Sequence, residues 1–344
     1  MHGVIEQFTD VVVVGGGPAG SSTAIQCALT GHRVMLIEAE AFPRHRPGES
    51  LHPGVMLLLR QLGVESEIES AGFLRYLGQT VAWGNEPHFQ AFGASGGKPW
   101  LGIQASRERL DAILLQRAKD VGVTVYQPCR AESAIIENNR VCGIVTSRGT
   151  IRLTHVVDAT GGRNWLGRQL QCGVYRASRR LLAYYGYTPS TAEATCPQLT
   201  VDVDGWSWQA PLGDGRQAWV RLPFHGKSQY STELGNLRGA DVTWRMLPES
   251  AGSGYFLVGD AAVVLDPLLG HGVLRALLSG IQAAYLIDLL HRQRITEARA
   301  IQTYRSWYLD LFENNVAVLR DMYAQLPTSW RVDLKPPAVE LAVN

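Results

Sequence analysis

A glycine-rich turn between two predicted strands constrains the fold of this chain more than any other feature. Residues 10–14 form a short β-branched run, and the turn Gly15-Gly16-Gly17-Pro18-Ala19-Gly20 follows it. Residues 21–30 have the pattern of a helix, and residues 33–38 have that of a second strand. In such a βαβ unit Gly15 permits the tight turn, Gly17 lets the backbone approach a pyrophosphate, and Gly20 lets helix and strand pack closely.

The residue that ends the second strand narrows the ligand. Glu38 stands 18 residues after Gly20, where a carboxylate binds the diol of a ribose and disfavours a 2′-phosphate. The unit therefore predicts a binding site for FAD or NAD(H).

A second pair of segments favours FAD. Residues 258–262 (Val-Gly-Asp-Ala-Ala) follow a predicted strand, and residues 266–272 (Asp-Pro-Leu-Leu-Gly-His-Gly) precede a predicted helix. A carboxylate at a strand end can accept hydrogen bonds from a polyol, and a glycine-rich helix start can face an electron-rich carbonyl. FAD offers both a ribitol chain and a flavin pyrimidine ring, whereas NAD has no ribitol.

These segments resemble those of the p-hydroxybenzoate-hydroxylase-like FAD enzymes, which include aromatic hydroxylases, flavin-dependent halogenases and geranylgeranyl reductases. The resemblance extends to R-x-x-L-D at 107–111, to D-A-T-G at 158–161 and to residues 42–50, which match a segment that crosses above the flavin in halogenases. It implies an α/β fold: a GR2-type FAD-binding Rossmann-like domain, an interleaved antiparallel β substrate domain and C-terminal helices. The implied cofactor-binding residues are Gly15, Gly17, Gly20, Glu38, Arg46, Arg107, Asp158, Gly259, Asp260, Pro267, Gly270 and Gly272.

The order of predicted elements indicates interleaved domains. Helices are expected at 48–62, 106–121, 272–291 and 296–325, and strands at 78–102, 123–127, 130–158, 180–247 and 255–258. We predict a discontinuous FAD-binding domain from 1–75, 103–180 and 250–295. A β-rich substrate domain takes 76–102 and 181–249, and a C-terminal helical segment takes 296–344.

Composition excludes several classes of protein. The net charge of +1 gives no electrostatic reason to expect nucleic acid or an anionic membrane. The longest apolar runs are short, as at Val11–Val14, and no secretion signal is visible, so no membrane association is expected. Five widely spaced cysteines without a C-x-x-C pair predict neither a disulfide framework nor a metal site. A cytoplasmic location follows.

Three features narrow the branch of the family. Residues 205–211 (Gly-Trp-Ser-Trp-Gln-Ala-Pro) resemble the halogenase signature W-x-W-x-I-P, and geranylgeranyl reductases have a related Y-x-W-x-F-P. Halogenases also need a lysine shortly after the G-E-[SA] segment. Residues 50–97 contain no lysine, and Arg75 stands near the expected place. A guanidinium stays protonated and does not readily form a haloamine, which disfavours halogenation.

Residues 266–280 most resemble a subgroup that hydroxylates tryptophan side chains of a partner polypeptide while quinone-cofactor enzymes mature. The resemblance implies an FAD-dependent monooxygenase acting on an aromatic indole ring. Its partners would be an aromatic substrate such as a precursor polypeptide, O2, and either NAD(P)H or a separate flavin reductase as electron donor. The alternatives are a small-molecule aromatic hydroxylase, a halogenase-like enzyme, an FAD-dependent prenyl (geranylgeranyl) reductase and a non-enzymatic flavoprotein. The pocket candidates are Trp206, Trp208, His271 and Glu49, and no residue is assigned as catalytic acid or base.

Overall fold

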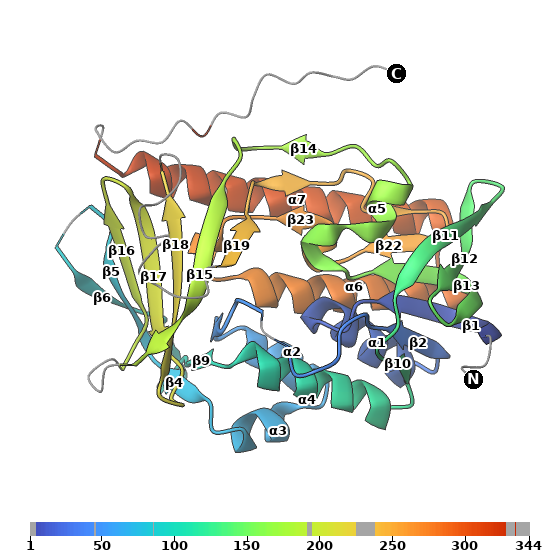
Figure 1. The fold of residues 1–344 in the computed structure, drawn as a ribbon, viewed down its shortest axis with the longest axis horizontal. Coiled ribbons are helices and arrows are strands. Elements are labelled where there is room, and N and C mark those ends of the chain that lie inside the picture. The colour runs from blue at the N-terminus through green and yellow to red at the C-terminus, as the bar shows by residue number, and fades with distance from the viewer. Residues whose placement is uncertain are drawn as a thin grey trace.

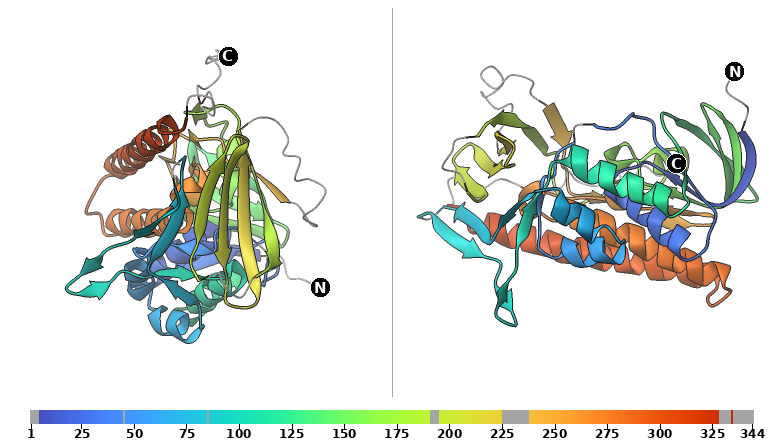
Figure 2. Two further views of the ribbon diagram at one scale, coloured as in Figure 1. Left: turned by 90° about the vertical axis from the view of Figure 1, so that its left-hand side faces the viewer. Right: turned by 90° about the horizontal axis from the view of Figure 1, so that it is seen from below.

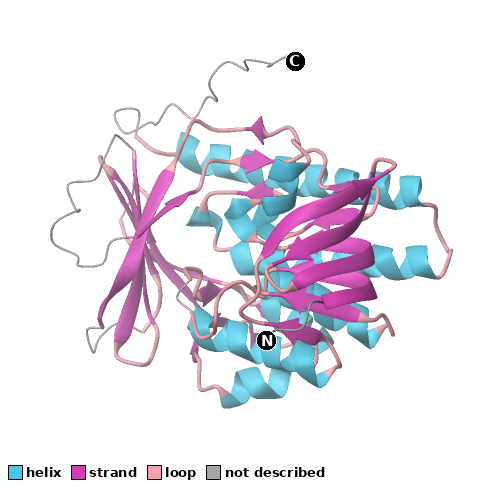
Figure 3. Ribbon diagram, turned by 45° about the vertical axis from the view of Figure 1, so that its right-hand side comes forward, coloured by secondary structure: helices cyan, strands magenta, loops and turns pink. Residues whose placement is uncertain are grey.

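The computed structural model describes residues 5–44, 46–84, 86–190, 195–224, 238–327 and 334. Two large sheets lie towards opposite ends of the molecule, and a long C-terminal helix runs past both of them (Figure 1). Most helices gather around the first sheet, whereas the second stands apart from them (Figure 3). This arrangement confirms the predicted mixed α/β fold class.

The first sheet carries the parallel strands of the nucleotide-binding unit. Its order is β10 (Thr124–Tyr126), β2 (Val34–Ile37), β1 (Ile5–Val14), β13 (Gly149–Asp158), β12 (Arg140–Thr146) and β11 (Ala131–Glu137). The last residues of β13 also pair in parallel with β22 (Tyr255–Leu257), which pairs in turn with β21 (Ala251–Gly252). The carboxyl ends of β1, β2, β13 and β22 therefore meet at one edge, where ligands of open α/β sheets bind.

Four helices pack around this sheet: α1 (Pro18–Leu29), α4 (Arg107–Asp120), α6 (Gly272–His291) and α7 (Glu297–Ala324). Helices α1 and α6 approach closely at Gly280. A Cβ atom there would lie 2.2 Å from Oγ of Ser22 and 2.4 Å from the carbonyl oxygen of Ala19. Glycine is thus required where the second FAD segment's helix rests on the first.

The second sheet has seven strands in the order β19 (Arg238–Asp241), β15 (Leu182–Pro189), β18 (Arg216–Pro223), β17 (Gly205–Pro211), β16 (Gln198–Asp202), β5 (Gly78–Ala82) and β6 (His88–Ala91). All neighbours are antiparallel except β16 and β5. Strands from two distant parts of the chain thus share this sheet. The exact domain boundaries stay a prediction.

Smaller elements join the two sheets. Strands β3 (Ser50–Leu51), β9 (Gly102–Gln104) and β4 (Leu74–Tyr76) form one small sheet. Strands β14 (Tyr175–Arg176), β20 (Arg245–Met246) and β23 (Val263–Val264) form another. The hairpin of β7 (Ala94–Ser95) and β8 (Lys98–Pro99) projects from the molecule (Figure 2). The short helices are α2 (Val55–Gln61), α3 (Glu65–Ser70) and α5 (Trp165–Gln169), with 3₁₀ turns η1 (Gly161–Arg163), η3 (Gly259–Ala261) and η4 (Pro267–Leu269).

Two predicted elements differ from the structure. The helix expected over 48–62 is shorter, because Ser50–Leu51 pairs with β9 and helix α2 begins only after Pro53 and Gly54. The hairpin expected over 130–158 is a three-stranded meander of β11, β12 and β13, since Arg148 and Gly149 turn the chain once more.

Helix α6 is the one helix of the described ranges that is long and apolar enough to cross a membrane. Counting unbroken apolar runs did not detect it, because polar residues interrupt the sequence. Buried core helices pass the same test, and α6 buries Val273, Leu277, Ala283 and Ile287 inside the molecule.

Candidate functional site

The glycine-rich turn leaves its backbone open at one end of α1. Gly15 has φ +110°, and a Cβ atom there would lie 2.4 Å from the carbonyl oxygen of Ala159. At Gly20 a Cβ atom would lie 1.8 Å from the carbonyl oxygen of Gly15, so both positions require glycine. At Gly17 the only neighbour within 4 Å is Nη2 of Arg44, at 3.4 Å. Gly17 is the N-cap of α1 and has no side-chain cap, so the helix start can bind an anion.

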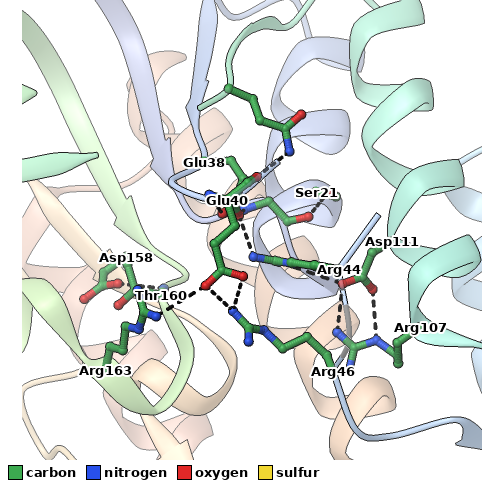
Figure 4. Close-up of polar contacts among 12 residues, drawn as sticks. Ser21, Glu38, Glu40, Arg44, Arg46, Arg107, Asp111, Asp158, Thr160 and Arg163 are labelled. Carbon is green, nitrogen blue, oxygen red and sulfur yellow. Dashed lines mark hydrogen bonds and ion pairs between the residues drawn. The ribbon is translucent and has the colours of Figure 1, made fainter. Parts of the chain in front are cut away.

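Glu38 lies against this turn (Figure 4). Its carboxylate is buried and accepts hydrogen bonds from the backbone N–H groups of Gly16, at 2.7 Å, and Glu40, at 2.8 Å. Arg44 pairs with it at 3.0 Å. The carboxylate is therefore fixed beside the open glycine turn.

Arg44 is a site residue that the sequence alone did not distinguish from the other residues of the 42–50 segment. Its guanidinium is largely buried and lies between Glu38 and Asp111, which is 3.8 Å away. The neighbouring Arg46 instead pairs with Glu40 at 2.8 Å. A clue in the sequence was the spacing of Arg44, six residues beyond the acidic end of β2.

Arg107 holds the 42–50 segment in place. Its Nε and Nη2 atoms donate to Asp111 at 2.9 and 3.1 Å, and its Nη1 atom donates to the carbonyl oxygen of Pro47 at 2.7 Å. Asp111 is fully buried, so it needs this cation. The R-x-x-L-D motif thus forms an i, i+4 pair that positions the loop.

Asp158 shapes the loop after β13. Its carboxylate is fully buried and accepts from the backbone N–H groups of Thr160, at 2.9 Å, and Leu166, at 2.8 Å. Burial raises its pKa, against the effect of these hydrogen bonds. The Asp158 carboxylate therefore organises the turn over residues 159–166.

The second segment brings an accessible carboxylate and an open helix start to the same edge. Asp260 is exposed, and it lines a cavity of about 640 Å³ together with Gly162, Arg168, Arg180 and Arg245. A Cβ atom added at Gly270 or at Gly272 would have no neighbour within 4 Å. Pro267 starts η4, which turns the chain into α6.

Arg275 leaves a buried donor beside Asp260. Its Nη1 atom is buried and has no hydrogen-bond partner among the described residues. The Asp260 carboxylate acts on Arg275 and favours its charged form, while burial lowers the pKa of Arg275. Such a donor is expected to bind a ligand oxygen or water.

These features fit FAD. Open glycine backbone and free helix starts suit its phosphates and pyrimidine ring, arginines match its negative charge, and Glu38 and Asp260 suit its hydroxyl groups. Among the described residues no cluster of His, Cys, Asp or Glu could hold a metal ion.

Glu49 joins this edge to the second sheet. It is buried, accepts from the backbone N–H of Gly48 at 2.9 Å, and forms a short hydrogen bond from the Tyr187 hydroxyl of β15. Burial raises the pKa of Glu49 despite the Tyr187 hydrogen bond and the nearby Arg107.

Trp206 and Trp208 have different surroundings. Trp206 is 1% exposed and donates its indole N–H to the Tyr323 hydroxyl at 2.9 Å, so it lies in the core and lines no open pocket. Trp208 is half-buried and donates to Oγ of Ser50 at 3.1 Å. Ser50 donates in turn to Gln104 at 2.9 Å.

His271, the N-cap of α6, packs edge to face against His52, with ring centroids 5.0 Å apart. The backbone N–H of Gly54 donates to Nδ1 of His52 at 3.0 Å, so a neutral His52 carries its proton on Nε2. Burial lowers the pKa of His271 to about 4, and His52 and Arg275 add to the effect. Burial also lowers the pKa of His52. Two neutral imidazoles therefore lie beside the start of α6 at neutral pH.

Comparison with known proteins agrees with this geometry. A family model described as an FAD binding domain matches residues 8–185, which is more than half of the 344 residues. The chain belongs to this family, which confirms FAD as its cofactor.

Individual relatives refine the class. A tryptophan 2-halogenase of Chondromyces crocatus is 28% identical over 92% of this chain and 68% of its own length. A menaquinone reductase of Mycobacterium tuberculosis is 28% identical over 97% of this chain and 90% of its own. The structure of the myxobacterial chondrochloren halogenase superposes with a TM-score of 0.85 at 26% identity, covering 95% of this chain and 86% of that one. The protein is thus an FAD-dependent oxidoreductase of the halogenase-like and hydroxylase-like group, as predicted.

Proposed function

We propose that this protein is an FAD-dependent monooxygenase that hydroxylates an aromatic indole ring. Bound FAD supplies the electrons and activates O2. In this proposal the turn at Gly15, Gly17 and Gly20 binds the pyrophosphate, Glu38 a ribose and Asp260 the ribitol. Arg44, Arg46 and Arg107 provide positive charge, and the segment Pro267–Gly272 faces the flavin.

The observation that carries the choice of oxygenation is the absence of lysine from residues 50–97, in a chain related to halogenases. Lys98 and Lys119 are exposed, on the projecting hairpin and on α4, while Lys227 and Lys335 lie outside the described residues. Arg75, near the expected lysine, lies on β4.

The chain's own residues can handle the proton that an aromatic ring loses on substitution. His271 and His52 are neutral bases at neutral pH, with their rings in contact. Trp208 offers an aromatic surface at the junction of the two sheets, and Glu49 beside Tyr187 closes that junction. We propose that the indole ring binds near these groups and that His271 accepts the ring proton.

The finer proposal is that the indole belongs to a tryptophan of a partner polypeptide during maturation of a quinone cofactor. It rests on the resemblance of residues 266–280. A precursor polypeptide would then be the substrate, and NAD(P)H or a separate flavin reductase would reduce the FAD.

A competition experiment tests this function. Protein loaded with FAD and reduced anaerobically is mixed with O2, bromide and either indole or N-acetyl-tryptophanamide, and products are identified by mass spectrometry. We expect products with an added oxygen atom. Brominated products would contradict the proposal and establish halogenation.

A second candidate is a prenyl reductase, favoured by the 28% identity with menaquinone reductase over nearly the full length of both chains. It predicts that the reduced protein is reoxidised without O2 when menaquinone in detergent is added, with a saturated side-chain double bond as product. Absence of that reaction removes this candidate.

A further inference from the structure

The strongest feature outside the roles assigned above is a buried carboxylate at the start of the flavin-facing segment. Asp266 is 1% exposed and caps η4, accepting from the backbone N–H of Leu268 at 3.0 Å. The Tyr323 hydroxyl donates to Oδ2 of Asp266 at 2.7 Å, and the indole N–H of Trp244 lies 3.4 Å from the same oxygen.

Tyr323 is rigidly held at the far end of α7. Its hydroxyl accepts the indole N–H of Trp206 at 2.9 Å. The Trp83 indole N–H donates to the carbonyl oxygen of Met322 at 2.9 Å, and the rings of Trp83 and Tyr323 meet edge to face at 5.9 Å. A residue 57 positions away in sequence thus reaches the flavin-facing segment through fixed contacts on several sides.

The Asp266 carboxylate can change its charge near neutral pH. Burial raises its pKa to about 6, although Leu268, Tyr323 and Trp244 all donate towards it. Apart from these groups the only charged side chain acting on the pair is Arg179, which faces Tyr323. With so few opposing charges, the electrostatic effect of Asp266 on its surroundings is weakly screened.

We propose that Tyr323 is a positioning residue that, through Asp266, sets the redox potential of the bound FAD. This inference rests on the proposed placement of the flavin at Pro267–Gly272. An ionised Asp266 opposes the arrival of electrons at that place. Uptake of one proton from solvent by Oδ2 of Asp266 removes the opposition, so reduction and protonation are coupled. The Tyr323 hydrogen bond favours the ionised form and hence the lower potential.

The test is the midpoint potential of FAD in the full-length loaded protein, measured by spectroelectrochemistry between pH 5 and 8. Tyr323→Phe removes the hydrogen bond. Tyr304→Phe is the matched control, because Tyr304 is a fully buried tyrosine of the same helix whose hydroxyl donates to the carbonyl oxygen of Leu257 at 2.8 Å.

We expect the ratio of reduced to oxidised FAD at a fixed solution potential and pH 7 to rise about three- to tenfold in Tyr323→Phe. That is about 15–30 mV for a two-electron couple. The break in the plot of potential against pH, near pH 6 in the wild type, should move to higher pH. If Tyr323→Phe matches Tyr304→Phe at every pH, the inference is wrong.

Asp266→Asn gives an independent test should Tyr323→Phe fail to fold. A neutral amide should abolish the break and hold the potential above that of the wild type at pH 7, whereas a break that persists would overturn the inference. The measurement needs neither substrate nor O2. Its failure therefore leaves the proposed hydroxylation standing, and failure of hydroxylation leaves this result standing.

Discussion

The indole N–H of Trp208 donates to the hydroxyl of Ser50 across 3.1 Å, and this contact joins β17 of the second sheet to β3. Ser50 follows Glu49 directly, so the aromatic strand is fastened to the segment that Arg107 holds beside the first sheet. The contact lies where the two sheets meet, and the substrate is proposed to bind there.

The two tryptophans of β17 should respond differently to substitution. Trp206→Phe should lower the free energy of unfolding by about 1–3 kcal/mol, because it opens space in the core and removes the donor to Tyr323. Trp208→Phe should cost less than about 1 kcal/mol, because the ring is half-buried and Ser50 keeps Gln104. Urea denaturation of both variants measures this. Equal losses would contradict the division into core and junction.

Gly272→Ala tests the place of the flavin. A Cβ atom there has no protein neighbour within 4 Å, so the stability of the apoprotein should not fall. If the flavin approaches the helix start, the methyl group should weaken FAD binding about tenfold or more, which fluorescence titration can measure. Gly173→Ala is the control, since its nearest atom is Oε2 of Glu249 at 3.8 Å. Unchanged FAD affinity in Gly272→Ala would place the flavin elsewhere.

Stability should fall in mild acid because of His155. Burial, with a contribution from Arg140, lowers the pKa of His155 to about 4, whereas an unfolded histidine has a pKa near 6.5. The unfolded chain therefore takes up the proton first as pH falls, and stability is lost between about pH 6.5 and 4. Glu297, His32 and His291 also face this imidazole.

His155→Gln removes this term. Its loss of unfolding free energy between pH 7 and pH 5 should be smaller than that of the wild type by about 2 kcal/mol. His88→Gln, an exposed position on β6, should follow the wild type. Parallel curves for His155→Gln and the wild type would show that the charged imidazole is accommodated in the folded state.

The sequence predicted local features well and side-chain partners poorly. The glycine turn, the acidic end of β2 and the bounds of α6 follow from spacing and periodicity, which act over a few residues. Arg44 beside Glu38 was missed, because several arginines of one loop compete for that carboxylate and only packing decides. The bond from Tyr323 to Asp266 joins residues 57 positions apart, and no local pattern reports it.

The most direct measurement is isotope incorporation from 18O2. Reduced, FAD-loaded protein is mixed with 18O2 and indole or N-acetyl-tryptophanamide in a single turnover, and the product is analysed by mass spectrometry. The proposed function predicts a hydroxylated ring that carries one 18O atom. Oxidation of FAD with an unchanged indole ring, or a hydroxyl oxygen that comes from water, would contradict it.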